Sequence, residues 1–198
     1  MKMNLPNKLT ILRMILIPVF MAFYFLDMIP YNHVIAAGVF ALAAFTDFLD
    51  GKIARKYNLV TNFGKFLDPI ADKALVSTAL IIYLTSAIAG KEALGFDPTI
   101  AYACCASVIV MRELLISGFR MIAAKNQVVL AADIWGKAKT FVTDFALAFL
   151  LVGTDLDGRL GEVVLVIGYV LFAIATLLTV ISGVNYILKN PDVLKDKA

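Results

Sequence analysis

The sequence predicts an all-α fold: a polytopic membrane protein built as a bundle of six transmembrane helices, with a short N-terminal interfacial segment. Of its 198 residues, 61% are hydrophobic and only 17% are charged. The mean hydropathy is +0.87. A soluble domain of this size could not cover so much apolar surface. The apolar residues also fall into separate runs, each long enough to cross about 30 Å of hydrocarbon.

The chain opens with a polar and basic stretch, Met1–Thr10, followed by an apolar run from Ile11 to Leu26. A signal peptide is the competing interpretation, but no small-residue cleavage site follows and further apolar runs do. We therefore expect an interfacial start that leads into the first transmembrane helix. Pro18 marks a position at which this helix can kink.

Five further spans are predicted, and no internal repeat separates them into domains. Either Thr61 or Asn62 is expected to cap the third span, which places Pro69 near its first turns, where proline is better tolerated. We expect one membrane domain over residues 1–198. The five spans cover about Val34–Tyr57, Gly64–Ala89, Thr99–Ala124, Ala131–Val152 and Val163–Leu188.

The basic residues are distributed unevenly between the two ends of these spans. With six spans, both termini lie on one side of the membrane, and only Lys91 and Arg159 of the 18 basic residues fall opposite. The positive-inside rule therefore predicts that both termini and the adjoining loops are cytoplasmic. The other 16 are Lys2, Lys8, Arg13, Lys52, Arg55, Lys56, Lys65, Lys73, Arg112, Arg120, Lys125, Lys137, Lys139, Lys189, Lys195 and Lys197.

Four aspartates stand out in this apolar sequence, and the stretch DFLDGKIARKYNLVTNFGKFLDPIAD holds them all. Asp47 and Asp50 are spaced i, i+3, and Asp68 and Asp72 are spaced i, i+4, so each pair projects from one face of its helix. The polar connection between them allows the two pairs to meet. Four carboxylates without a histidine or cysteine suit a hard cation such as Mg²⁺ or Mn²⁺.

Single aspartates at helix ends are often only solvated or capping residues, but that interpretation explains the set poorly. Asp47 follows an apolar run, where an ionisable group is costly and usually functional. Gly51, Ala54 and Gly64 are small residues that allow a ligand to approach the backbone. The guanidinium group of Arg55 can bind a phosphate through two parallel hydrogen bonds. The stretch therefore predicts a metal–diphosphate site.

The order D-x-x-D-G-x-x-A-R, eight residues, then G-x-x-x-D-x-x-x-D is matched in full. It resembles the signature of the CDP-alcohol phosphatidyltransferases, membrane enzymes that transfer a phosphatidyl or related group from a CDP-linked donor. No position departs from the pattern. The matching residues are Asp47, Asp50, Gly51, Ala54, Arg55, Gly64, Asp68 and Asp72.

The resemblance implies a role for each signature residue. The four aspartates would hold two divalent ions, with Asp72 also serving as general base. CDP-diacylglycerol would bind to other residues of the same stretch, and Arg55 would bind one of the phosphates of this donor. It also implies a homodimer surrounded by membrane lipids, and no nucleic-acid partner. The remaining donor-binding residues would be Gly51, Ala54, Thr61 and Gly64, with Asn7 and Thr10 at the cytoplasmic mouth.

A second group of charged residues lies in the fourth and fifth spans. Arg112 and Arg120 can share a helix face, and Lys137 and Asp144 lie on one face of the next helix. Charges at such depth usually face a bundle interior. We expect Arg112, Arg120 and Lys137 to bind an acceptor phosphate. A purely structural ion pair of Asp144 with Lys137 or an arginine is the alternative. Lys125 and Lys139 are expected to contact lipid headgroups or to be plain positive-inside charges.

The segments LPNKLTILR, RELLISGFR and WGKAKT look like those of bacterial family members whose acceptor is glycerol 3-phosphate. Inositol phosphate is the nearest alternative acceptor. A small transporter would also use intramembrane carboxylates, typically at the midplane and with an inverted repeat, and neither is evident here. His33, the only histidine, is expected in a short outer loop. Cys104 and Cys105 are expected to be buried thiols.

Overall fold

The computed structural model describes residues 4–57, 61–125 and 134–191, and these residues are helical with no strand among them. The predicted all-α class is confirmed. The elements are α1 (Leu5–Tyr24), α2 (Asn32–Lys56), α3 (Asn62–Tyr83), the 3-10 helix η1 (Leu84–Ala89), α4 (Gly90–Leu94), α5 (Thr99–Lys125), α6 (Ile134–Asp155) and α7 (Gly158–Leu188).

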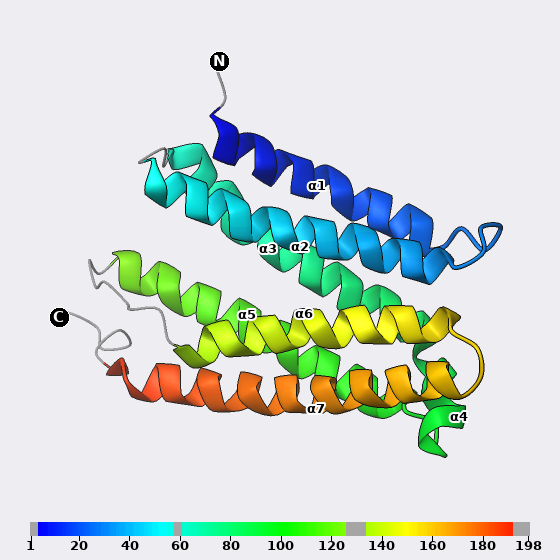
Figure 1. Cartoon of the computed structure of the whole chain (residues 1–198). Coiled ribbons are helices and arrows are strands. Elements are labelled where there is room, and N and C mark those ends of the chain that lie inside the picture. Colours follow the sequence, from blue (N-terminus) through cyan, green and yellow to red (C-terminus); the bar gives the residue numbers. More distant parts are fainter. Residues whose placement is uncertain (1–3, 58–60, 126–133, 192–198) are drawn as a thin grey trace.

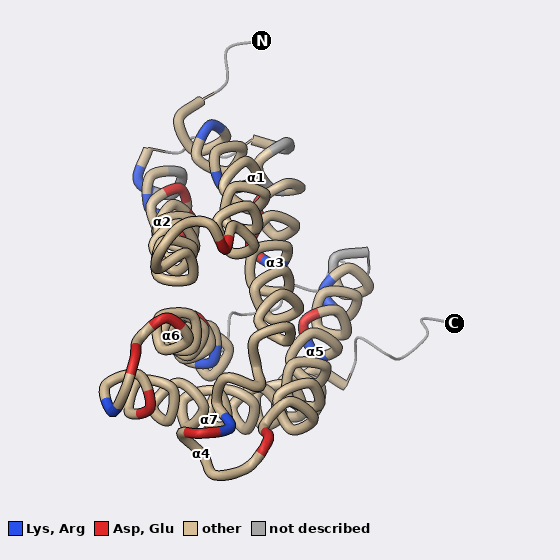
Figure 2. The backbone as a smooth tube through the Cα atoms, turned by 90° about the vertical axis from the view of Figure 1, so that its right-hand side faces the viewer, with Lys and Arg blue, Asp and Glu red and all other residues tan. Residues whose placement is uncertain are grey.

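The long helices run back and forth along one direction, so alternate connections lie at opposite ends of the bundle (Figure 1). The start of α1, the end of α2 and the start of α3 are at the same end as the end of α5, the start of α6 and the end of α7. This end carries most of the basic residues, as the sequence predicts. Along the bundle axis, α1 and α2 lie on one side of α3, and α7 lies on the other (Figure 2).

Five helical segments of the described chain are long and apolar enough to cross a membrane. They correspond to α1, α2, α3 with its continuation to Leu94, α5 and α7. The remaining long helix, α6, has 22 residues, enough for a rise of about 33 Å. It carries four charged residues along its length, Lys137, Lys139, Asp144 and Asp155. The protein is thus a polytopic helical membrane protein.

The apolar core lies between the helices and is rich in aromatic side chains at the end opposite the basic residues. Phe20 and Phe40 join α1 to α2, and Tyr102 of α5 stacks on Phe172 of α7 with ring centroids 4.6 Å apart. Tyr102 also donates a hydrogen bond to the Leu80 carbonyl of α3. This packing fixes the relative positions of the helices that carry the polar residues at the other end.

Several boundaries differ from those predicted. The first helix begins at Leu5, because Asn4 caps it through the Asn7 amide and Pro6 occupies its first turn. Part of the expected interfacial segment is therefore the start of α1, and residues 1–3 lie outside the described chain. The third helix ends at Tyr83 rather than Ala89 and continues as η1 and α4. Of the two predicted capping residues, Thr61 is the N-cap, and its hydroxyl accepts from the Gly64 amide.

Two further expectations are wrong. His33 lies in the first turn of α2, not in a loop, and its ring contacts the Asp155 carboxylate. Asp155 also accepts from the Val34 amide, so this carboxylate satisfies the start of α2 from the end of α6. Cys104 is exposed on the surface of the single chain, and Cys105 is only partly buried. Both thiols are on α5, one of the helices that are long and apolar enough to cross a membrane.

Candidate active site

The first part of the site is a row of polar residues on one face of α1. Asn7, Thr10 and Arg13 are spaced by three residues, so they lie one above the other, and all three are buried. Asn7 accepts a hydrogen bond from the Thr61 hydroxyl at 3.0 Å. Thr10 donates to a carboxylate oxygen of Asp68. The row therefore attaches α1 to α3 at the position of the aspartate signature.

Arg13 has no exposed side-chain surface and forms ion pairs with both aspartates of the first pair. Its Nη1 lies 2.7 Å from Asp47 Oδ1, and its Nη2 donates to Asp50 Oδ2. The Asp50 side chain is 3% exposed and that of Asp47 is 44% exposed. A buried carboxylate needs such a partner, because an uncompensated charge in a low-dielectric interior is very costly. Arg13 thus balances Asp50 inside the bundle while Asp47 remains accessible.

The two aspartate pairs approach each other, as the sequence predicts. Asp47 lies near enough to Asp68 and Asp72 for electrostatic interaction, and Asp50 interacts in the same way with Asp47 and Asp68. We call these four residues the aspartate cluster. Gly64 allows close packing beside it, since a Cβ there would lie 2.9 Å from Asn7 Oδ1.

The donor atoms of the aspartate cluster fit a hard divalent cation, because all are carboxylate oxygens and Asp47 is open to ligands. In the described residues, however, no three acidic, histidine or cysteine side chains already converge as a metal site. Arg13 and Thr10 instead bind three of the four carboxylates, Asp47, Asp50 and Asp68. The residues therefore suit the ions by chemistry, and the hydrogen-bonded partners on α1 hold the carboxylates in place.

Two of the signature residues cannot be placed in detail. The backbone of Ala54 and Arg55 belongs to α2, but their side chains lie outside the described residues. Gly51 lies one residue after Asp50 and is partly buried. The expected donor-phosphate contact of Arg55 therefore stays a prediction.

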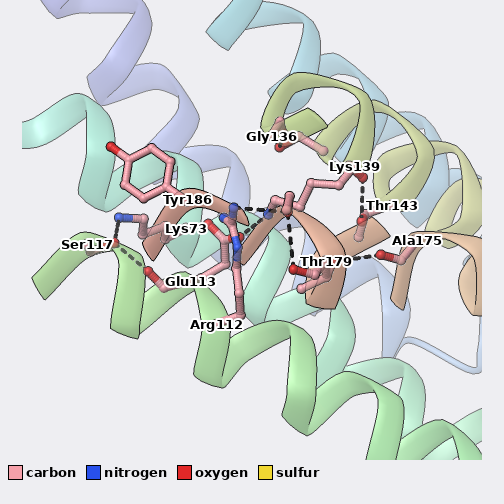
Figure 3. Close-up of polar contacts among 12 residues, drawn as sticks. Lys73, Arg112, Glu113, Ser117, Gly136, Lys139, Thr143, Ala175, Thr179 and Tyr186 are labelled. Atoms are coloured by element: carbon pink, nitrogen blue, oxygen red, sulfur yellow. Dashed lines mark hydrogen bonds and ion pairs between the residues drawn. The ribbon is translucent and has the colours of Figure 1, made fainter. Parts of the chain in front are cut away.

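A second polar site lies between α3, α5 and α6, where side chains line a small pocket. Lys139 of α6 binds Glu113 Oε1 of α5, and Arg112 Nη1 donates to the same oxygen at 3.1 Å. Lys73 of α3 binds the Ser117 hydroxyl, one turn along α5 (Figure 3). We call Lys73, Arg112, Glu113 and Lys139 the cation pocket. The pocket lining consists of Asp72, Lys73, Val76, Ser77, Leu80, Ile109, Val110, Glu113, Lys139, Thr140 and Thr143.

The surroundings of Arg112 show how α7 makes room for this arrangement. Arg112 Nη2 donates to Ser182 Oγ at 3.1 Å. A Cβ at Gly183 would lie only 3.1 Å from Arg112 Cγ, so glycine allows the arginine to pack along α7. The guanidinium is therefore held between α5 and α7 with one edge directed at Glu113.

The predicted acceptor residues are not equivalent in the structure. Arg112 belongs to the cation pocket, whereas the side chains of Arg120 and Lys137 are exposed. Arg120 Nε donates to the Tyr186 hydroxyl, and its guanidinium lies over that ring at 5.4 Å from the centroid. Lys139, which was expected at lipid headgroups, is only 5% exposed and faces the bundle interior. Lys125 has no described side chain.

Four residues of the site were not singled out from the sequence, namely Arg13, Lys73, Glu113 and Lys139. Arg13 carried a usable signal, because it continues the three-residue spacing of Asn7 and Thr10 inside an apolar run. Lys73 directly follows Asp72 and was counted only as a basic residue. Lys139 could not be distinguished from Lys137, since two residues of spacing place them on different faces of α6 and nothing local says which face is inward.

Comparison with known proteins adds independent evidence. A family model described as CDP-alcohol phosphatidyltransferase matches residues 3–181. The CDP-diacylglycerol--glycerol-3-phosphate 3-phosphatidyltransferase of Bacillus subtilis (strain 168) is 40% identical, over 97% of this chain and 97% of its own length. The proteins of the same name from Rickettsia bellii and Haemophilus influenzae are 39% and 35% identical, over 92% and 94% of this chain and 93% of their own lengths.

Proposed function

Because the chain belongs to the CDP-alcohol phosphatidyltransferase family, we propose that it transfers the phosphatidyl group of CDP-diacylglycerol to glycerol 3-phosphate, as bacterial phosphatidylglycerophosphate synthases do. The products are phosphatidylglycerophosphate and CMP. The reaction is a step of membrane phospholipid biosynthesis. Its donor is a lipid and its acceptor a small anion, so the enzyme needs a site for each beside the membrane.

The position of Asp72 is the observation that supports this proposal most directly. Asp72 interacts electrostatically with Asp47 of the aspartate cluster, and it also lines the pocket that contains Lys73, Glu113 and Lys139. A carboxylate at this junction is within reach of both a CDP-linked donor and a phosphorylated acceptor. An acceptor without a phosphate, such as serine, would have no use for the neighbouring cations.

In the proposed mechanism, a hydroxyl oxygen of the acceptor attacks the phosphorus of the phosphatidyl group. One P–O bond forms, the P–O bond to CMP breaks, and its electron pair leaves on the CMP phosphate. Asp72 accepts the hydroxyl proton as general base. The transfer is direct and inverts configuration at phosphorus, because His33 lies at the opposite end of the bundle and the two thiols are on α5, away from Asp72. A chiral-phosphorus donor that gave net retention would contradict this mechanism.

Asp47, Asp50, Asp68 and Asp72 would hold the two Mg²⁺ or Mn²⁺ ions expected for this family. When bound, the ions neutralise charge on the diphosphate and on the leaving CMP. Arg55 would bind a donor phosphate, and Gly51 and Ala54 would leave room for the cytidine. The Asn7, Thr10, Thr61 and Gly64 group would shape the nucleotide side of the site from α1 and α3.

The acceptor phosphate is proposed to bind Arg112 together with Lys73 and Lys139. Charge-assisted hydrogen bonds from a guanidinium and ammonium groups are strong phosphate contacts in a buried site. Arg120 and Lys137 are exposed, so their proposed role is to attract the anion from solution toward the pocket.

We also propose that the basic end of the bundle faces the cytoplasm and that the protein works as a homodimer in the cell membrane. The orientation follows from the 16-to-2 distribution of basic residues. In a variant with Cys104 and Cys105 replaced by serine, a cysteine introduced at Thr154–Gly161 should react with an impermeant reagent outside the cell. A cysteine near the C-terminus should not. The opposite labelling would reverse the orientation.

An acceptor panel with purified protein tests the function itself. CMP release from CDP-diacylglycerol is measured with Mg²⁺ and glycerol 3-phosphate, inositol phosphate, serine or phosphatidylglycerol. Glycerol 3-phosphate should be used with the highest kcat/KM. Preference for inositol phosphate would assign a different acceptor to the same chemistry, and no metal-dependent CMP release with any acceptor would refute the proposal.

A further inference from the structure

Asp144, in the middle of α6, is a partly buried carboxylate that the mechanism above does not use. Its Oδ1 is buried and has no hydrogen-bond partner among the described residues. Buried carboxylates in native proteins are almost always paired, so an unpartnered oxygen indicates that something outside the described chain satisfies it. In an enzyme, a bound substrate is one such partner.

The neighbours of Asp144 place it beside the reaction site. Among charged residues, Asp72 has the largest electrostatic interaction with Asp144, followed by Asp47 and Lys139. The sequence alternative, an ion pair with Lys137 or an arginine, is not found in the described part of the chain. Lys139 lies nearby but pairs with Glu113 rather than with Asp144.

Helix register connects Asp144 to the pocket. Thr140 lines the pocket and is four residues before Asp144, so the two share a face of α6. The neighbouring Thr143 also lines it, although its hydroxyl donates to the Lys139 carbonyl. Asp144 does not line the pocket itself, but this register places it one turn beyond Thr140 and directly after Thr143.

Resting on the proposed function, we infer that Asp144 accepts a hydrogen bond from the second hydroxyl of the acceptor and so selects a phosphorylated diol. With the phosphate at Arg112, Lys73 and Lys139 and the attacking hydroxyl at Asp72, the remaining hydroxyl of glycerol 3-phosphate lies between these two points. Asp144 interacts both with Asp72 and with Lys139, and among the described residues its Oδ1 is the buried carboxylate oxygen without a hydrogen-bond partner.

A hydrogen-bond donor fits this position. Asp72 and Asp47 act on Asp144 more strongly than Lys139 does, so the negative charge around its unpartnered oxygen favours a donor such as a hydroxyl. The negative charge of Asp144 also keeps the acceptor phosphate away from the Asp72 end. The acceptor is thereby oriented with its phosphate in the cation pocket and its hydroxyls toward the reacting phosphorus.

The test compares glycerol 3-phosphate with 3-hydroxypropyl phosphate, which lacks only the second hydroxyl. We would measure kcat/KM for both acceptors at saturating CDP-diacylglycerol in the wild type, Asp144→Ala, Asp144→Asn and Asp97→Asn. The wild type should prefer glycerol 3-phosphate by about ten- to a hundredfold, the range expected for one hydrogen bond to a charged group. Asp144→Ala should use both about equally, and Asp144→Asn should keep part of the preference.

Asp97→Asn is the control, because Asp97 lies between α4 and α5 and its side chain accepts only from the Thr99 amide in the described chain. It should keep the wild-type preference. If Asp144→Ala is inactive, thermal unfolding is measured with each acceptor in turn. The stabilisation by each acceptor reports its affinity, and the ratio of the two affinities replaces the ratio of kcat/KM values.

Each outcome is distinct. Wild-type protein that does not turn over glycerol 3-phosphate contradicts the proposed function. Normal wild-type turnover with an unchanged preference in Asp144→Ala overturns the role of Asp144 alone. The role of Asp144 is also overturned if its variants need more Mn²⁺ for half-maximal rate but still prefer glycerol 3-phosphate. Asp144 would then contribute to metal binding rather than to acceptor binding.

Discussion

The aspartate cluster and the cation pocket are opposite in charge but built on the same plan. In the first, one buried guanidinium, Arg13, pairs with Asp47 and Asp50 of the four carboxylates. In the second, one carboxylate, Glu113, pairs with Lys139 and Arg112, while Lys73 binds Ser117. In each cluster a residue of opposite charge offsets part of the cost of burial, and the cluster retains a surplus of the sign that its proposed ligand lacks.

The difference between the two lies in which helices they join. The aspartate cluster connects α1, α2 and α3, whereas the cation pocket connects α3, α5 and α6. Only α3 belongs to both, through the consecutive residues Asp72 and Lys73. This explains how donor and acceptor can be bound by separate groups of helices and still meet at one carboxylate.

Neutralising the aspartate cluster should have the largest effect. Asp68→Asn should lower kcat/KM by on the order of a hundred- to a thousandfold, since it removes charge that would hold the metal ions. EDTA should abolish wild-type activity, and Mg²⁺ or Mn²⁺ should restore it. Asp47→Asn and Asp50→Asn should behave similarly and still insert into membranes. Full turnover in chelator would remove the metal ions from the mechanism.

Replacing Arg13, the positive charge beside the aspartate cluster, should lower the stability of the folded protein. Arg13→Ala leaves the buried Asp50 carboxylate uncompensated, so thermal unfolding in detergent should show a loss of about 3–5 kcal/mol. Arg13→Lys should recover part of it. Mg²⁺ should stabilise Arg13→Ala more than the wild type, because the ion would replace the lost positive charge. Equal stabilisation of both proteins would mean that Arg13 and the metal do not share these carboxylates.

Lys139 of the cation pocket and the exposed Lys137, two residues before it, form a matched pair for mutagenesis. Lys139→Ala should raise the KM for glycerol 3-phosphate by about ten- to a hundredfold and leave that for CDP-diacylglycerol nearly unchanged. Lys137→Ala should have a much smaller effect, because the Lys137 side chain is exposed. Initial rates are measured with each substrate varied while the other is saturating. The reverse ranking would return the acceptor phosphate to Lys137, as the sequence alone favoured.

The smallest effect is expected at the polar cluster of the opposite end. Asp155→Asn weakens the contact with His33 and the cap on α2, so it should cost roughly 1 kcal/mol of stability. Both KM values should stay at the wild-type level, because this cluster satisfies its own hydrogen bonds and lies far along the bundle from Asp72. A selective change in acceptor KM would show that the two ends are coupled.

The sequence by itself determined the helical membrane class, the approximate spans and the aspartate signature. These features are local: apolar runs of sufficient length must be helical in lipid, since every backbone polar group needs a partner within its own segment. Spacings of three and four residues likewise define a helix face without reference to any other helix. The Thr61 cap of α3 followed from the same local chemistry.

Only the tertiary structure decided which charged residues meet. Arg13 is 37 residues from its partner Asp50, and Lys139 is 26 residues from Glu113. The sequence could not choose between Lys137 and Lys139, because that choice depends on the rotation of α6 about its axis. Packing of α6 against its neighbours sets the rotation, and burial of one lysine rather than the other follows from it. The same rotation directs Asp144 toward Asp72.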